Sequence, residues 1–398
     1  MRQIATIVLI LLVTFGSAMR NRALLLSDWV EVTTSAGFGV RTRYGGGVVD
    51  NKIYLYGGVV GTTYKNDVWV TTDGFIWTEV SATSAWSSRA YFGSVVLNNK
   101  MYVLGGVKTG TFHNDVWSSG DGVTWVEASQ GSANLFTARR SHVCVTLNNN
   151  IYVLGGILPN GDVVNDVWVS TDFGANWVQV ISSAGWVARM SFQALAYNGK
   201  MYVIGGADND SSRYNDVWSS VDGALWVEVV AAAPWSARDS HAVVVYEDKF
   251  YVMGGDSVNS VKLNDVWSSD DMGETWSQDS QSAQWSVGYS HMSVVYNNMM
   301  YVLGGSQGSS VWAVESAPTG QPSSSPSGQP TTQPTCVPSG QPTTQPTCIP
   351  SGQPTTQPST HPIVHGNIST SVRSAITLTW CSGHILLFGC AIANYMNN

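Results

Sequence analysis

Short runs of apolar residues alternate with polar turn residues along most of the chain, and the arrangement recurs about every 50 residues. Each period holds two runs in which successive residues are apolar, such as AVVVY at 242–246 and FYVMGG at 250–255. Strands that are buried on both faces have this composition. Polar pairs such as Asn98-Asn99 separate these two runs, and an Asp-Gly pair often follows a third run. Both are turn signals, so the pattern predicts four short antiparallel strands in each period.

Gly-Gly pairs mark six repeats and begin at Gly57, Gly105, Gly155, Gly205, Gly254 and Gly304. A Tyr precedes each pair by three residues, and five of the pairs are followed by Asn-Asp-Val-Trp and then by a second Trp. One four-stranded sheet cannot bury both of its faces, so neighbouring sheets must stack around an axis. The repeats therefore predict an all-β fold, a six-bladed β-propeller over residues 28–316 in which each repeat is one blade.

The sixth repeat has a third strand at Val311-Trp312 and then enters a proline-rich segment, so it lacks a fourth strand. A matching strand stands at the other end of the propeller, because residues 29–32 (WVEV) repeat residues 226–229 (WVEV). We expect the N-terminal strand to complete blade six. Such closure removes the exposed sheet edges.

At this point the residues resemble the kelch-repeat family, whose signature is a Gly-Gly pair, a preceding Tyr and a Trp in the third strand. The resemblance covers residues 28–315. Two hairpins, at 170–177 and 269–276, also resemble the Asp box of sialidase-type propellers. Asp boxes are structural turns, so they imply a shared hairpin geometry and no shared chemistry.

The resemblance implies a binding surface on the face that carries the loops between strands two and three and between blades. Two sets of residues on this face are candidate ligand-binding residues. The first set stands two residues after the Arg, or after Gly288 in blade six, that precedes the first strand of each blade, and lies nearer the channel mouth. Its members are Arg43, Tyr91, Ser141, Ser191, Ser240 and Ser290. The second set belongs to an aromatic-x-x-Arg motif: Trp86, Trp186, Trp235 and Trp285. Aromatic rings and arginines could stack on sugars or bind carboxylates.

The aromatic-x-x-Arg motif also has a structural reading, which we favour because regularity in a repeat usually serves packing. Blade six lacks both the Arg, where Gly288 stands, and the Asn-Asp pair. This joint loss suggests that each Arg pairs with the Asp of its own blade, as Arg238 with Asp265.

Charge and composition narrow the functional classes. The net charge of −8 and the absence of a basic stripe argue against a nucleic-acid partner. Copper enzymes of the galactose-oxidase type need Tyr and His ligands and a Cys beside a Tyr. Here three histidines recur at one repeat position, namely His142, His241 and His291. Cys144 has no evident Tyr partner. We expect no catalytic residue, no metal and no cofactor. A carbohydrate-active enzyme that uses the channel mouth, similar to a sialic-acid mutarotase or a copper oxidase, stays open as the alternative.

The segments outside the repeats suggest an extracellular or cell-surface protein. Residues 1–18 resemble a secretory signal peptide, and residues 317–362 form a Pro/Ser/Thr/Gln-rich repeat linker. Cys336 and Cys348 recur within this linker and could join chains through disulfides, or be incidental. The apolar tail at 375–393 could be a transmembrane helix, a lipid-anchor signal or neither. Together these features predict a non-catalytic extracellular module that binds a glycan or a protein.

Overall fold

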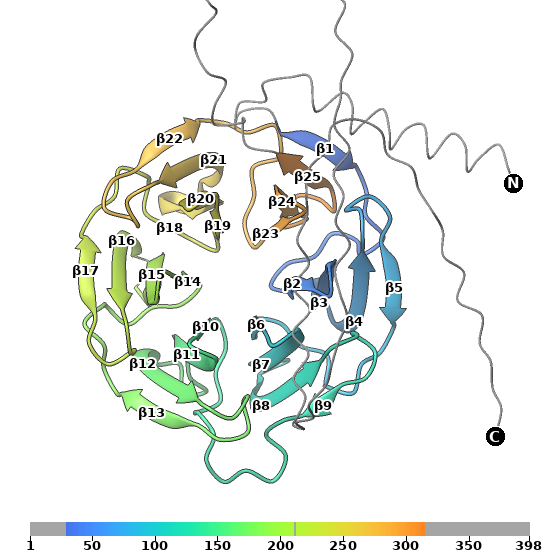
Figure 1. Ribbon diagram of the computed structural model, residues 1–398, viewed down its shortest axis with the longest axis vertical. Helices are drawn as coiled ribbons and strands as arrows, with labels where there is room; N and C mark the ends of the chain where they lie inside the picture. Colours follow the sequence, from blue (N-terminus) through green and yellow to red (C-terminus); the bar gives the residue numbers. More distant parts are fainter. Residues whose placement is uncertain (1–28, 211, 315–398) are drawn as a thin grey trace, which may run out of the picture. The chain divides into compact units, whose positions relative to one another are not determined.

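The computed structural model describes residues 29–210 and 212–314, which form six antiparallel sheets arranged as blades around a central axis (Figure 1). The predicted signal peptide at 1–18, the linker at 317–362 with Cys336 and Cys348, and the tail at 375–393 lie outside the described residues. No helix in the described part of the chain has the length and apolar composition that crossing a membrane requires. The prediction of a six-bladed all-β propeller is confirmed.

Each blade contributes one strand to the wall of the channel. These inner strands are β2 (Gly45–Val49), β6 (Gly93–Leu97), β10 (Val143–Leu147), β14 (Gln193–Tyr197), β19 (Ala242–Tyr246) and β23 (Met292–Tyr296). The second strands follow them: β3 (Lys52–Val60), β7 (Lys100–Lys108), β11 (Asn150–Ile157), β15 (Lys200–Ala207), β20 (Lys249–Ser257) and β24 (Met299–Leu303). In blade five the short strand β18 (Arg238–Asp239) also pairs with β20, and the 3-10 helix η1 (Val258–Ser260) follows β20.

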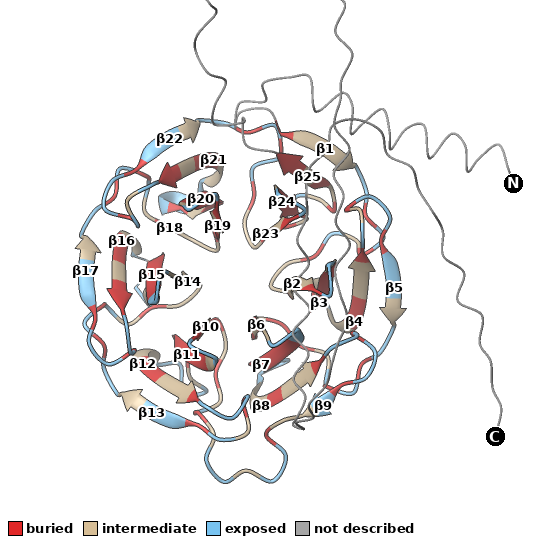
Figure 2. Ribbon diagram, viewed as in Figure 1, coloured by how far each residue is buried: buried red, intermediate tan, exposed pale blue. Residues whose placement is uncertain are grey.

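The third strands carry the Asp-Val-Trp motif or its equivalent: β4 (Thr63–Thr71), β8 (Thr111–Ser119), β12 (Val163–Ser170), β16 (Arg213–Ser220), β21 (Lys262–Ser269) and β25 (Val311–Val314). The outer strands are β5 (Thr78–Ser81), β9 (Val126–Glu127), β13 (Val178–Ile181), β17 (Val227–Val230), β22 (Ser277–Ser280) and β1 (Val30–Thr33). Burial falls from the second strands to these outer strands, as the colours of Figure 2 show.

The N-terminal strand closes the ring, as the sequence predicts. Strand β1 pairs with β25 in antiparallel register, with Val30 opposite Ala313. The backbone N–H of Trp29 donates to the side-chain oxygen of Gln284 at 3.1 Å. Its indole ring meets that of Trp285 edge to face at 6.3 Å. Blade six is therefore built from both ends of the propeller.

The loops between strands two and three are very short in blades one and two. There the strands continue past the Gly-Gly pair and leave only two-residue turns, at 61–62 and 109–110. The ladder can continue because the pair forms a bulge, with register shifts between Tyr56 and Gly58 in blade one. Gly57 and Gly58 both have positive φ there, at 64° and 84°. Glycine adopts this conformation without a steric penalty.

The connections define two faces. The loops between strands two and three and those between blades lie on one face, which we call the loop face. The turns between strands one and two and between strands three and four lie on the other, which we call the hairpin face.

Candidate functional site

The channel mouth on the loop face is encircled by one residue from each blade: Arg43, Tyr91, Ser141, Ser191, Ser240 and Ser290. All six have positive φ, between 51° and 59°. Five backbone N–H groups each donate to the carbonyl of the preceding member, from Tyr91 to Arg43 (3.2 Å) through Ser290 to Ser240 (2.8 Å). Non-glycine residues seldom hold this conformation, and such positions gather at functional sites. The six side chains line a cavity of about 260 Å³.

The large side chains of this mouth ring come from two neighbouring blades only. Four of its members are serines, whereas Arg43 and Tyr91 are large. The guanidinium carbon of Arg43 lies 4.4 Å from the centre of the Tyr91 ring, and that of Arg140 lies 5.3 Å from it. Neither arginine forms an ion pair with any residue that the structure describes. Two uncompensated positive charges therefore flank one aromatic ring.

Arg140 was missed by sequence reasoning, although the repeats contain a signal for it. The position after each blade's entry Arg or Gly holds Thr42, Ala90, Met190, Asp239 and Tyr289 in the other blades. Only blade three places a cation there. Burial raises the pKa of Tyr91, while the charges of Arg43 and Arg140 act in the opposite direction. The phenol therefore stays protonated and can donate a hydrogen bond.

Two acidic residues on the same face, Asp239 and Asp256, are already neutralised. Arg213 of blade four binds Asp239 and Asp256 of blade five, at 2.7 Å and 3.2 Å. Lys262 adds a contact of 2.6 Å to Asp256. This network offers a ligand little net charge, so the free charge of the mouth lies on the side of blades one to three.

The channel wall behind the serines contains the three repeating histidines. Burial lowers the pKa of His142 to about 3 and that of His291 to about 4, so both rings are neutral near pH 7. The ring nitrogen Nε2 of His291 makes a 3.1 Å hydrogen bond with the carbonyl of Met253 in the neighbouring blade. Among the described residues, no group of three or more His, Cys, Asp or Glu side chains is placed to hold a metal ion.

The structure rules out the four tryptophans as ligand-binding residues and agrees with the packing role that the structural reading of their motif predicts. Trp86, Trp186, Trp235 and Trp285 are only 1–3% exposed, and each ring meets the edge of another Trp between two blades. A ligand at the channel mouth cannot reach them. Their bulk fills the seams between neighbouring sheets, so we exclude them from the candidate site.

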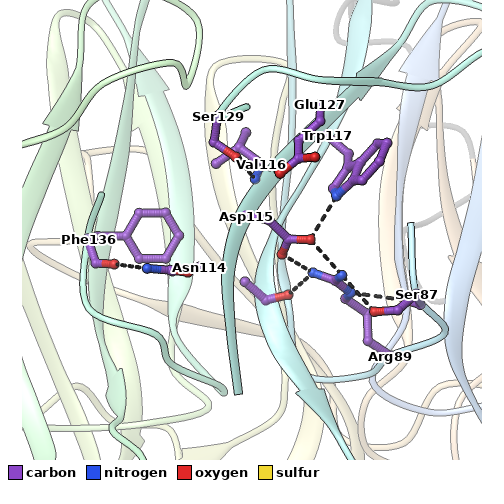
Figure 3. Close-up of polar contacts among 10 residues, drawn as sticks. Ser87, Arg89, Asn114, Asp115, Val116, Trp117, Glu127, Ser129 and Phe136 are labelled. Atoms are coloured by element: carbon purple, nitrogen blue, oxygen red, sulfur yellow. Dashed lines mark hydrogen bonds and ion pairs between the residues drawn. The ribbon is translucent and has the colours of Figure 1, made fainter. Parts of the chain in front are cut away.

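The arginines of the same motif are structural, as the pairing hypothesis proposes. Arg238 binds both carboxylate oxygens of Asp265, at 2.7 and 2.8 Å. The same bidentate pair occurs in all five blades that carry the motif, and the five arginines are at most 2% exposed. Figure 3 shows the example of Arg89, which also donates to Ser87, while Trp117 donates to Asp115 at 2.8 Å. Burial raises the pKa of Asp115, but the hydrogen bonds and charge of Arg89 outweigh it and hold that pKa below its usual value.

Blade six departs from this arrangement. Gly288 and Ser310 occupy the places of the Arg and the Asp, and a small cavity of about 20 Å³ lies between them. The indole N–H of Trp312 donates to the Ser310 hydroxyl at 3.1 Å in place of a carboxylate. The symmetry of the ring therefore breaks at this blade.

Comparison with known sequences agrees with this geometry. The family described as the KLHDC2/KLHL20/DRC7 Kelch-repeats domain matches residues 26–182 and 141–315. The two matches together span well over half of the 398-residue chain. No curated protein matches this chain.

Proposed function

The chain belongs to the kelch-repeat family of β-propellers, and on that premise we propose that it is an extracellular module that binds a glycan or protein ligand at its channel mouth. Kelch propellers are generally non-catalytic and act as binding or scaffold modules. The proposal is more specific, because it assigns the ligand to the mouth ring of the loop face and to Arg140 beside it.

One observation supports the proposal more than any other: Arg43 and Arg140 lie against Tyr91 with no carboxylate partner among the described residues. An arginine held against an aromatic ring is oriented in advance and binds a carboxylate or a similar anion with little loss of entropy. The hydroxyl groups of Ser141, Ser191 and the other serines of the mouth ring can bind further polar groups. We infer that the ligand carries an acidic group, as acidic glycans and acidic peptide segments do.

A binding array tests this proposal. The purified protein is applied to neutral and acidic glycans and to acidic and basic peptides, and its copper content and sugar turnover are measured in parallel. We expect binding to acidic members only, without turnover. Binding confined to neutral or basic members would contradict the assignment of the ligand. Stoichiometric copper or turnover of a sugar would instead support the carbohydrate-active alternative.

A further inference from the structure

A further hollow lies on the hairpin face, between blades one and two, which are neighbours in Figure 1. This seam groove has a volume of about 420 Å³. It is bordered by the turn after β2, by the β4–β5 hairpin and by residues Gly120 and Asp121 of the β8–β9 hairpin. It shares no lining residue with the cavity at the channel mouth.

The seam groove offers apolar surface. Tyr54, Val70, Val80 and Ile76 line it. Ile76 is 56% exposed, as is its neighbour Phe75, and both stand in the β4–β5 hairpin. Two adjacent large apolar side chains with half of their surface in water form a favourable contact for a partner.

The rim of the seam groove is negatively charged. Asp50, Asp73 and Asp121 line it, against a single cation, Lys52, which pairs with Asp50 at 3.9 Å and leaves a net negative charge. One oxygen (Oδ1) of Asp73 and of Asp121 accepts the backbone N–H groups of its own hairpin. The other oxygen (Oδ2) of Asp73 accepts no hydrogen bond from a described residue, whereas Asp121 also accepts one from the side chain of Thr124. The Asp73 oxygen can therefore bind a cation that arrives from outside.

Gly120 keeps the seam groove open. The other hairpins of this type carry a side chain at the same place: Thr72, Thr171, Val221 and Asp270. A Cβ added to Gly120 would have only the carbonyl of Asn99 within 4 Å, at 3.7 Å, and its φ lies outside the left-handed region. Neither backbone conformation nor packing requires glycine here. Its effect is to leave space beside Asp121.

We propose that this seam groove is a second docking site, which binds a basic segment of a protein partner. An arginine or lysine side chain would lay its aliphatic stem on Tyr54 and Ile76 and place its charge among the carboxylates. An acidic partner is disfavoured by repulsion. A second copy of this chain would also bring carboxylates together if it used the same face.

The test uses the full chain and two labelled hexapeptides, one of alternating leucine and arginine and one with glutamate in place of arginine. Fluorescence anisotropy should show binding of the arginine peptide and none of the glutamate peptide. Gly120→Thr, which installs the residue of blades one and three, should weaken binding at least about tenfold. Asp50→Asn, which copies Asn98 of blade two, should weaken it and reduce its salt dependence.

Asp270→Thr is the matched control, because it changes the same hairpin position in blade five and also removes a carboxylate from the hairpin face. It should leave the affinity unchanged. Arg43→Ser should leave it unchanged as well, which separates this site from the channel mouth. Three results would overturn the proposal: no binding by the wild type, equal binding by Gly120→Thr, or a concentration-dependent dimer that Gly120→Thr abolishes. The last would assign the groove to a second copy of the chain.

Discussion

Each arginine that enters a blade is held by several acceptors at once. In blade five the guanidinium of Arg238 donates to the carbonyls of Ser236 (3.0 Å) and Gly254 (2.9 Å) and to both oxygens of Asp265. The side chain is inaccessible to water. Because a buried charge is tolerated only when it is paired, the Arg and the Asp depend on each other.

Replacing this arginine should therefore be costly. Arg238→Ala leaves the carboxylate of Asp265 buried without its partner, and we expect it to lower the free energy of unfolding by about 3–5 kcal/mol. Chemical denaturation measures the change, with the exposed Lys100→Ala as the control. An Arg238→Ala protein with the wild-type denaturation midpoint would refute the structural role.

The hairpin carboxylates should make stability depend on acid pH. The backbone N–H of Leu225, followed by that of Ala224, lowers the pKa of Asp222 from its ordinary value of 3.8. A carboxyl whose pKa is lower in the folded state stabilises the protein above the unfolded pKa, and this contribution disappears as pH falls through the folded pKa. We expect thermal stability to drop below about pH 4, and to drop less steeply in Asp222→Asn. Identical pH profiles for the two proteins would contradict this role of the carboxylate.

The repeats make some residue roles predictable and others not. The Arg–Asp pair could be predicted because blade six loses both partners together. The mouth ring could be predicted because its members share one repeat position. The regular spacing of Trp186 and its equivalents favoured a packing role, but periodicity alone does not show whether a ring points into a seam or toward the channel, so these residues also stood as binding candidates.

At the scale of elements, the Asp box is more widespread than the sequence indicated. The sequence suggested two such hairpins, at 170–177 and 269–276, but residues 29–314, as far as the structure describes them, form five. In blade two the Ser119 hydroxyl donates to Asp121 at 3.0 Å and accepts the N–H of Gly122 at 2.9 Å. This hairpin has one residue fewer between the Asp and the Gly than the motif, yet its hydrogen bonds are the same. The residue spacing of the motif therefore identifies only two of the five hairpins.

Blade six lacks the Arg–Asp pair and therefore allows the converse experiment, in which the pair is installed. Gly288→Arg alone should destabilise the protein, because it brings a charge to a small cavity without a counterion. Adding Ser310→Asp should restore much of the loss. A double-mutant cycle measured by thermal unfolding should give a favourable coupling of about 1–3 kcal/mol. Strictly additive effects would show that the cavity of blade six cannot hold the pair.

At the scale of the whole molecule, closure of the ring by β1 is the feature that unites the blades. It could be predicted because residues 29–32 repeat the outer strand of blade four. The lengths of the loops between strands two and three could not be predicted. The ladder continues beyond the Gly-Gly pair in blades one to five, and this continuation depends on bulge geometry.

Loss of the closing strand should loosen one blade first. Trp29 is 4% exposed and packs against Trp285, so Trp29→Ala should cost about 3–5 kcal/mol. Hydrogen exchange should accelerate most in β25, which would lose its outer neighbour, and least in β12 of blade three. Uniform acceleration of hydrogen exchange across all blades would contradict a local stabilisation of blade six by β1.

Binding at the channel mouth is tested most directly by calorimetric titration of the tightest acidic ligand from the array into two proteins, the wild type and Arg43→Ser/Tyr91→Ser. Both substitutions install the residue that four other blades hold at the same positive φ, so the fold should be retained. The proposed site predicts that the double variant loses at least about tenfold in affinity and most of its salt dependence. An affinity equal to that of the wild type would contradict it.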